Sequence, residues 1–236
     1  MVCTLDKNKV SVIRKALKAL GKKNFVFIMH NGSFPSVEGE NTGFGTINSQ
    51  AGKNFIDYAS GLFDAIQMGP AGKTKSSDSS PYTGTIFSNN PLFIDLKELT
   101  TDKWHKILSE KTFKDIVDNN PNKDKNKTSY SYITKRQDEA LTEAYENFLK
   151  LNDKKLNAEF DTYKIENDSW LDKDSLYEAF ALENGTDYWP NWKNKADKNV
   201  FNPKSIEEKI EYGKRIDEMS KKYAKEIDKY KFIQFV

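Results

Sequence analysis

The stretch Phe63–Leu96, FDAIQMGPAGKTKSSDSSPYTGTIFSNNPLFIDL, carries most of the information about the fold of this chain. It opens with a short apolar run at 65–68, which has the length and residue types of a buried β-strand. A long loop of small polar residues begins at Gly69 and includes Tyr82. Loops of this length in compact domains are usually functional or disordered. In an α/β barrel the loops that follow strands form the active-site face, so the segment 69–91 is our candidate for an active-site loop.

The residues before this stretch alternate between helical and strand-like patterns. Apolar residues at helical spacing predict a helix over 7–20, and the apolar run 25–29 predicts a second buried strand. Ser49 is a suitable N-cap for a helix that extends to about residue 62. With the strand at 65–68, the order is strand, helix, strand. This is a βαβ unit, which implies parallel strands and a right-handed crossover.

From residue 100 onward, Gly and Pro become sparse while Lys, Glu and Asp become dense. A polar segment at 119–129, rich in Lys and Asn, predicts a mobile surface loop. Ser205 and Glu208 form a capping-box pattern at the start of the last helix. Helical spacing of apolar residues predicts helices at 101–109, 112–117, 134–151, 156–165, 167–182 and 206–236. This part of the chain is therefore predicted to be helical.

The spaced pattern Gly-Pro … Ser-Pro-Tyr … Asn-Pro-Leu-Phe-Ile-Asp-Leu in the opening stretch resembles the active-site loop of 4-α-glucanotransferases, the amylomaltases of glycoside hydrolase family 77. Three later segments resemble the helical insertion of that family. They are Asn167–Phe180 with its Trp-Leu pair, the Trp189–Trp192 loop and the closing Phe232–Phe235. The resemblance extends from about Lys22 to Val236.

The resemblance implies an α/β fold class, namely an incomplete (β/α)8 TIM-type barrel, represented by its first strands, with a large α-helical insertion. We expect residues 1–99 to form the first βαβ part of a catalytic barrel with the active-site loop at 69–91. We expect residues 100–236 to form the helical insertion subdomain. A barrel of this type closes with eight strands, and this sequence predicts far fewer. It therefore resembles the N-terminal half of such an enzyme.

The reaction that the resemblance implies is the transfer of α-1,4-glucan segments between maltooligosaccharides by a retaining double displacement, without a cofactor. Retention requires two carboxyl groups close together. In the family these lie on later strands, and their motifs are not found in this sequence. We therefore expect no catalytic residue in this chain, which would be inactive alone. The expected partners are an α-1,4-glucan or maltooligosaccharide and, as a candidate, a C-terminal half-chain that completes the barrel.

Three residues of the loop are expected to bind substrate. By resemblance, the ring of Tyr82 packs on a glucose ring beside the scissile bond, and Ser80 donates a hydrogen bond. Asn90 is a third candidate, because an amide suits sugar hydroxyls. Each of two residues also has a structural alternative. The ring of Tyr82 could instead pin the loop to the core. Asn90, which precedes a Pro, could instead open a turn, and for Asn90 we favour this interpretation. Thr83 replaces a usual Gln, so the outer sugar contacts are expected to differ from those of the family.

Other polar and aromatic candidates carry less weight. His30 ends a predicted strand and is interpreted as a hydrogen-bonded structural residue. Because only His105 and Cys3 could join it, no zinc site is expected. The aromatic cluster at 188–192 is either a sugar platform or, as we favour, a cap that packs on the helices.

Composition argues against several classes of partner. The net charge is +2 and the only arginines are Arg14, Arg136 and Arg215, so a nucleic-acid partner is not expected. A single cysteine fits a reducing compartment. The N-terminus lacks the apolar core of a signal peptide, and no apolar run is long enough to cross a bilayer. We expect a cytoplasmic protein that binds neither nucleic acid nor membrane.

Two alternatives to an enzyme portion remain open. One is a non-catalytic glucan-binding or regulatory protein that has kept the loop. The other is a helical interaction protein. An incomplete barrel would expose apolar surface along the edge of its second strand, and this surface would also promote aggregation.

Overall fold

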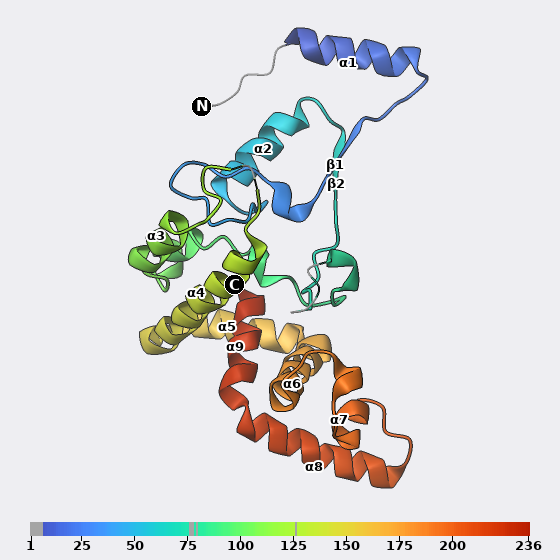
Figure 1. Cartoon of the computed structure of the whole chain (residues 1–236), viewed down its shortest axis with the longest axis vertical. Coiled ribbons are helices and arrows are strands. Elements are labelled where there is room, and N and C mark those ends of the chain that lie inside the picture. Colours follow the sequence, from blue (N-terminus) through green and yellow to red (C-terminus); the bar gives the residue numbers. More distant parts are fainter. Residues whose placement is uncertain (1–6, 76–77, 79, 126) are drawn as a thin grey trace. The chain divides into compact units, whose positions relative to one another are not determined.

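The computed structural model describes residues 7–75, 78, 80–125 and 127–236 (Figure 1). Its α-helices are α1 (Lys7–Ala19), α2 (Gln50–Ser60), α3 (Glu110–Asp118), α4 (Tyr130–Leu151), α5 (Lys154–Glu166), α6 (Asp168–Asn184), α7 (Lys195–Asn199), α8 (Ile206–Lys222) and α9 (Ala224–Phe235). The strands are β1 (Val26–Met29) and β2 (Ala65–Met68). Single 3₁₀ turns are η1 (Asn31–Ser33), η2 (Pro81–Thr83), η3 (Pro91–Phe93), η4 (Glu98–Thr100), η5 (Asp102–Trp104) and η6 (Trp189–Asn191).

Contacts between Cα atoms group the chain into two compact units. The first combines the residues up to Ala71 with Pro91–Asn147, and the second combines Gly72–Asn90 with Phe148–Val236. The loop predicted to be functional is thus grouped with the later helices and not with its neighbours in sequence. The predicted division separates a barrel portion, 1–99, from an insertion, 100–236. Grouping residues by their contacts does not test that division, which stays a prediction.

The two strands form a parallel two-stranded sheet, as predicted for a βαβ unit. Val26 pairs with Ala65 and Met29 with Met68, and α2 connects the strands. Ser49 caps α2 as expected, because its Oγ accepts a hydrogen bond from Gly52 N at 3.0 Å. The described residues are mostly helical with this small sheet, which is compatible with an α/β fold.

The prediction that both strands are buried is wrong. Phe27 packs on Phe63 and Phe55, with ring centroids 5.0 and 6.0 Å apart, so one face of β1 is covered by aromatic rings. On the opposite face Val26 and Ile28 are exposed, and Ile28 retains 73% of its accessible surface. Successive side chains of a strand point to opposite faces, and among the described residues each strand pairs only with the other. Apolar runs of this kind are buried only where both faces of a sheet are covered.

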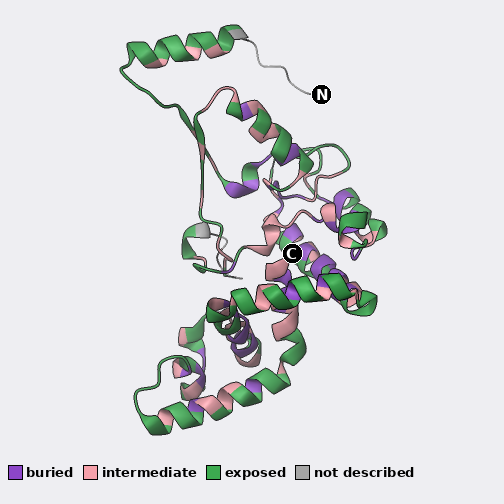
Figure 2. Ribbon diagram, turned by 180° about the vertical axis from the view of Figure 1, so that it is seen from behind, coloured by how far each residue is buried: buried purple, intermediate pink, exposed green. Residues whose placement is uncertain are grey.

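The first unit has its core around α3 and α4 (Figure 2). Its fully buried side chains include Leu96, Leu99, Ile107, Leu108, Ile116, Ile133 and Leu141. The predicted helix at 101–109 is wrong. The segment forms only the short turn η5, because His105 and Lys106 follow it with φ values of 51° and 54°, a left-handed conformation that an α-helix cannot contain.

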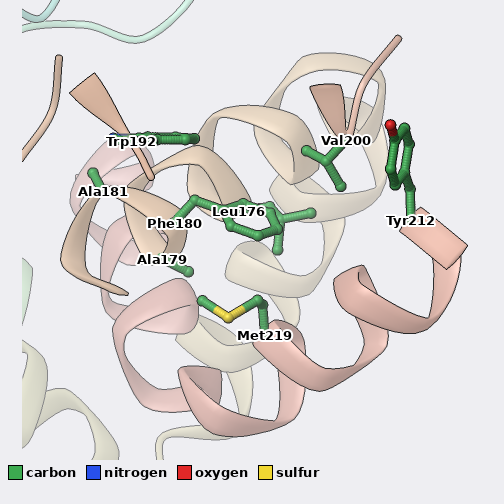
Figure 3. Packing of buried hydrophobic residues seen from close by; sticks show 8 residues of the cluster. All are labelled: Leu176, Ala179, Phe180, Ala181, Trp192, Val200, Tyr212 and Met219. Carbon is green, nitrogen blue, oxygen red and sulfur yellow. The ribbon is translucent and has the colours of Figure 1, made fainter. Parts of the chain in front are cut away.

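The second unit is built from α5 to α9, and its core cluster lies between α6, α7 and α8 (Figure 3). The cluster consists of Leu176, Ala179, Phe180, Ala181, Trp192, Val200, Tyr212 and Met219. A second aromatic contact joins Phe148, Phe160 and Phe232, with ring centroids 4.8 to 6.0 Å apart.

The predicted single helix from residue 206 to the end is wrong, because α8 ends at Lys222 and α9 begins at Ala224. Tyr223 between them has φ −113° and ψ 29°, which is not helical. The break lets Met219 pack in the α6 cluster while Phe232 packs against Phe160 of α5. One straight helix could not direct its apolar side chains at both targets.

Candidate functional site

The loop 72–90 has a paired base. Gly72 and Asn89 form an antiparallel bridge, and the N–H of Lys73 donates to the carbonyl of Ser88 at 2.8 Å. The N–H of Thr85 donates to the carbonyl of Lys73 at 2.9 Å. We call the segments at the two ends of the loop, around Gly72 and around Thr85–Asn89, its arms. They approach so closely at Gly72 that a Cβ there would lie 1.9 Å from Thr85 O. Only glycine fits this position without moving the backbone.

A chain of buried hydroxyl groups joins this base to α6 and α9. The Tyr230 hydroxyl donates to Ser88 Oγ at 2.6 Å, and Ser88 Oγ donates to Asp174 Oδ2. Ser88 is fully buried and Tyr230 nearly so. Burial raises the pKa of Tyr230, so its phenol stays a neutral donor at neutral pH. Because each buried hydroxyl has a partner, the base of the loop is fixed to two helices of the second unit.

A second set of contacts fixes the residues on either side of Ser88. The amide of Gln234 near the end of α9 accepts from Asn89 N at 2.8 Å and donates to Asn89 O at 3.0 Å. The ring of Phe87 stacks on Trp170 of α6, with centroids 6.2 Å apart and planes 20° apart. Both helices therefore hold the loop by backbone and side-chain contacts.

The opposite arm of the base is held by charge. Lys73 Nζ forms an ion pair with Glu178 of α6 and lies 5.3 Å from the centroid of the Tyr230 ring. Its side chain is mostly buried, so the pair is better shielded from water than an ordinary surface pair.

Tyr82 lies at the tip of this loop, in the turn η2, with 83% of its surface exposed. The alternative in which its ring is buried and pins the loop to the core does not describe this structure. Its role as a sugar platform stays a prediction. The turn itself is held by Asp78, whose Oδ1 accepts from Ser80 N at 2.9 Å and whose Oδ2 accepts from the Thr83 hydroxyl at 3.1 Å.

The other two predicted binding residues occupy different places in the loop. Ser80 is half-buried and directly precedes η2, and its carbonyl accepts from the N–H of Thr83 at 3.2 Å. Asn90 is half-buried at the end of the loop, directly before η3. The favoured interpretation of Asn90 as a turn opener agrees with this position. Neither position tests whether the two side chains bind sugar.

A buried amide lies at the carboxyl end of the sheet. Asn31 follows β1, and its Nδ2 donates to the carbonyls of Gly69 and Pro70 after β2, at 3.0 Å each. It therefore ties the two strand ends together. His30 has the structural role that we favoured, because its Nδ1 accepts from Gly32 N at 3.1 Å and caps η1.

Sequence reasoning missed most of the residues that hold the loop. Asn31, Ser88, Asp174 and Tyr230 have no local pattern that marks them, because their partners are far away in the chain. Gln234 had one signal, since it lies inside the closing segment Phe232–Phe235 that carries part of the resemblance.

The predicted aromatic cluster at 188–192 is divided by the structure. Trp192 is buried in the core of the second unit, as a packing residue (Figure 3). Tyr188 and Trp189 are exposed. The favoured interpretation as a packing cap is therefore correct for one of the three rings.

The loop presents an exposed phenol ring on an anchored base, an arrangement suited to binding the apolar face of a ligand that also carries hydroxyl groups. Within the part of the chain that the structure describes, no group of three or more His, Cys, Asp or Glu side chains could hold a metal ion. No helix of the described residues is long and apolar enough to cross a bilayer.

Comparison with known proteins gives two findings. A family model described as 4-alpha-glucanotransferase matches residues 30–236. A curated relative, the 4-alpha-glucanotransferase of Clostridium butyricum, is 26% identical over 212 residues, which are 88% of this chain and 37% of the relative. The chain thus spans a little over a third of the length of that relative. The matched residues include the whole loop 72–90 and all helices of the second unit.

Proposed function

Because the chain belongs to the 4-alpha-glucanotransferase family, glycoside hydrolase family 77, we propose that residues 1–236 form the N-terminal portion of an enzyme that transfers α-1,4-glucan segments between maltooligosaccharides. The loop 72–90 contributes to the site for the glucan. The ring of Tyr82 packs on a glucose ring, Ser80 donates a hydrogen bond to a sugar hydroxyl, and Asn90 opens the turn at the end of the loop or contacts sugar itself.

One observation carries this proposal. The ring of Tyr82 is 83% exposed on a loop whose base is fixed to α6 and α9. Exposing an aromatic ring to water forgoes the free energy of its burial, about 2 kcal/mol for a large apolar side chain. A ligand that covers the ring recovers that free energy. Because the base is already fixed, little conformational entropy is lost when the ligand binds.

The reaction proposed for the complete protein is a double displacement with retention of configuration. One carboxylate attacks the anomeric carbon and the leaving sugar oxygen takes a proton from a second carboxyl group, which later deprotonates the acceptor hydroxyl. We assign both carboxyl groups to segments outside residues 1–236, which complete an eight-stranded barrel that begins with β1 and β2. In this proposal residues 1–99 belong to the barrel, residues 100–236 are a helical insertion, and a C-terminal half-chain is the protein partner. The reaction needs no cofactor, and the compartment is the cytoplasm.

Calorimetric titration of the chain with maltoheptaose tests the binding site. Wild-type protein is expected to bind, and Tyr82→Ala to weaken binding at least tenfold, which corresponds to about 1.4 kcal/mol. Tyr82→Phe keeps the ring and is expected to keep most of the affinity. Ile86→Ala alters another highly exposed side chain of the same loop. It serves as the control and is expected to leave the affinity for maltoheptaose unchanged.

A second assay tests the assignment of the catalytic acids. The pure chain is expected to show no disproportionation of maltotriose, and activity is expected only when the remaining barrel segments are supplied. Robust activity of the 236-residue chain alone would contradict that assignment. A non-catalytic glucan-binding protein stays the alternative, because the described contacts at Ser88 and Asn89 already hold the loop on α6 and α9 of this chain. Glucan binding without activity, even after the barrel segments are added, would favour it.

A further inference from the structure

The turn between α6 and α7 is held by side-chain and backbone hydrogen bonds. Beneath it, Trp192 is only 2% exposed and its Nε1 donates to the carbonyl of Thr186 at 2.8 Å. The N–H of Tyr188 donates to Thr186 Oγ1 at 3.1 Å, and the hydroxyl of Tyr177 in α6 donates to the carbonyl of Asp187. The turn therefore has a defined shape before any ligand arrives.

The same turn directs two large aromatic side chains into solvent. Tyr188 is 46% and Trp189 52% exposed. These two rings are not needed to attach the turn to the core. Trp192 already attaches it by packing against Tyr177 and Phe180, with ring centroids 5.2 and 6.0 Å apart. Two exposed rings on a rigid turn form a preorganised apolar surface.

A contact connects this surface with the loop that carries Tyr82. Lys75, within the loop, places its Nζ 5.5 Å from the centroid of the Tyr188 ring. The ammonium group lies within the range of a cation–π interaction, which is favourable even at exposed sites. Lys75 and Tyr82 belong to one loop of the second unit, so this contact links the loop to the turn that carries Tyr188.

We propose that Tyr188 and Trp189 form a second contact surface for the α-1,4-glucan, next to the Tyr82 loop. This inference rests on the proposed function and extends it by naming further binding residues. The apolar face of a pyranose ring lies on the indole of Trp189, while sugar hydroxyls are within reach of polar groups at the edge. Lys75 supplies such a group, and the exposed side chains of Asn191 and Lys193 flank the rings in sequence.

The surface suits a carbohydrate better than a protein. Only two exposed rings are involved, and lysine and asparagine side chains border them, whereas protein interfaces depend on larger apolar patches with few lysines at their centre. A sugar chain matches a small apolar surface with a polar border, because each glucose unit has an apolar face and a rim of hydroxyl groups. A maltooligosaccharide that is long enough touches both surfaces, and a short one touches a single surface.

The test compares the affinities of the whole chain for maltotriose and maltoheptaose by calorimetry. For wild-type protein, maltoheptaose is expected to bind at least tenfold more tightly than maltotriose. Trp189→Ala is expected to reduce this preference to about twofold, and Trp189→Tyr, which keeps an aromatic face, to restore most of it. Phe201→Ala is the matched control, because Phe201 is 46% exposed in the same unit and follows α7. It is expected to keep the preference.

Three further measurements test whether the effect of Trp189→Ala comes from lost sugar contact and not from a disturbed fold. The melting temperature of Trp189→Ala is expected to stay close to that of wild type, because Trp192 and not Trp189 fills the core beneath the turn. Lys75→Ala provides a second variant, which removes the contact with Tyr188 without substituting a residue of the turn, and it is expected to weaken maltoheptaose binding about threefold. The tryptophan fluorescence of wild type is expected to change on addition of maltoheptaose, and that of Trp189→Ala to change less.

The outcomes separate this inference from the proposed function. If Tyr82→Ala weakens binding while Trp189→Ala and Lys75→Ala both leave the preference for maltoheptaose unchanged, the second surface is wrong and the proposed function stands. If the wild-type chain binds neither oligosaccharide, the glucan site at Tyr82 is wrong, and this surface fails with it.

Discussion

At the scale of single residues, the carboxylate of Asp197 is buried and joins three helices of the second unit. Its side chain, in α7, is 1% exposed. Arg215 of α8 reaches it with two nitrogens, Nε at 2.8 Å from Oδ1 and Nη2 at 3.2 Å from Oδ2. Asn184 at the end of α6 donates to Oδ2 at 3.0 Å. A buried ion pair contributes little net free energy, but breaking it leaves an uncompensated charge in the interior.

Arg215→Ala is therefore expected to destabilise the second unit by about 3–5 kcal/mol. The comparison variant is Arg14→Ala, which breaks the exposed pair between Arg14 and Asp64 and is expected to have a much smaller effect, because water screens exposed pairs. Denaturant titration followed by circular dichroism measures both. Equal effects of the two variants would contradict the importance that we assign to burial.

A second residue-scale prediction concerns pH. Glu183 accepts hydrogen bonds from Lys222 Nζ at 2.6 Å and from the Tyr223 hydroxyl at 2.7 Å, and these lower the pKa of its carboxyl group to about 2. A carboxyl group whose pKa is lowered by folding adds stability above its unfolded pKa, about 4.3, and loses it as the pH falls through its folded pKa.

The melting temperature of wild type is accordingly expected to fall between about pH 5 and pH 2. Glu183→Gln is expected to melt lower at pH 7 and to show a weaker dependence over the same interval, because it carries no proton-binding group at this site. Parallel curves for wild type and variant would rule out this contribution.

The element that decides the candidate site is the loop 72–90. Its contacts come from α6 and α9 of the second unit, although its neighbours in sequence belong to the first unit. Ser88 lies 142 residues from Tyr230, and Asn89 lies 145 residues from Gln234. Helices from the second half of the chain thus hold the loop that presents Tyr82.

Gly72→Ala tests the paired base of this loop. The added Cβ would lie 1.9 Å from Thr85 O, so the arms must separate. The amide hydrogens of Lys73, Thr85 and Asn89 are expected to exchange several-fold faster, because their hydrogen bonds open more often. Hydrogen exchange followed by mass spectrometry measures the effect.

The control for that variant is Gly213→Ala, in the interior of α8, where a Cβ would have nothing within 4 Å. It is expected to stabilise α8 by about 0.5–1 kcal/mol, because alanine favours the helix. If Gly72→Ala leaves exchange in the loop unchanged, the base is more tolerant than its geometry indicates.

At the scale of the whole molecule, the first unit exposes one face of a two-stranded sheet. An isolated pair of strands is marginally stable in water, and exposed apolar strands are sites of aggregation. Val26 and Ile28 lie on this face and Met68 on β2 is also exposed. In the proposed enzyme, further strands of the barrel cover this sheet.

Ile28→Thr is expected to raise the protein concentration at which light scattering first increases, without changing the melting temperature. Ile28 is 73% exposed, and threonine keeps the β-branched shape that strands prefer. Ile206→Thr is the control, because Ile206 is 74% exposed but lies at the start of α8. An equal improvement from Ile206→Thr would show that general surface polarity, and not the sheet, limits solubility.

The sequence by itself determined the local structure and the family. Apolar spacing located most helices, Ser49 marked the start of α2, and two short apolar runs gave the parallel pair of strands. The spaced motif around Tyr82 indicated the family that the comparison then found. These features depend on residues close together in the chain, whose conformational preferences and hydrogen bonds can be read without knowing the fold.

Only the tertiary structure decided which helices hold the Tyr82 loop and which rings face solvent. The hydroxyl chain through Ser88 joins groups far apart in sequence, and Trp189 and Trp192 differ in burial although they lie in one turn. The two strands were predicted to be buried, but one face of their sheet is exposed. An apolar run shows that a segment can be buried, but it does not show which segment covers it. Contacts between distant segments depend on how the whole chain packs, and no local pattern contains that information.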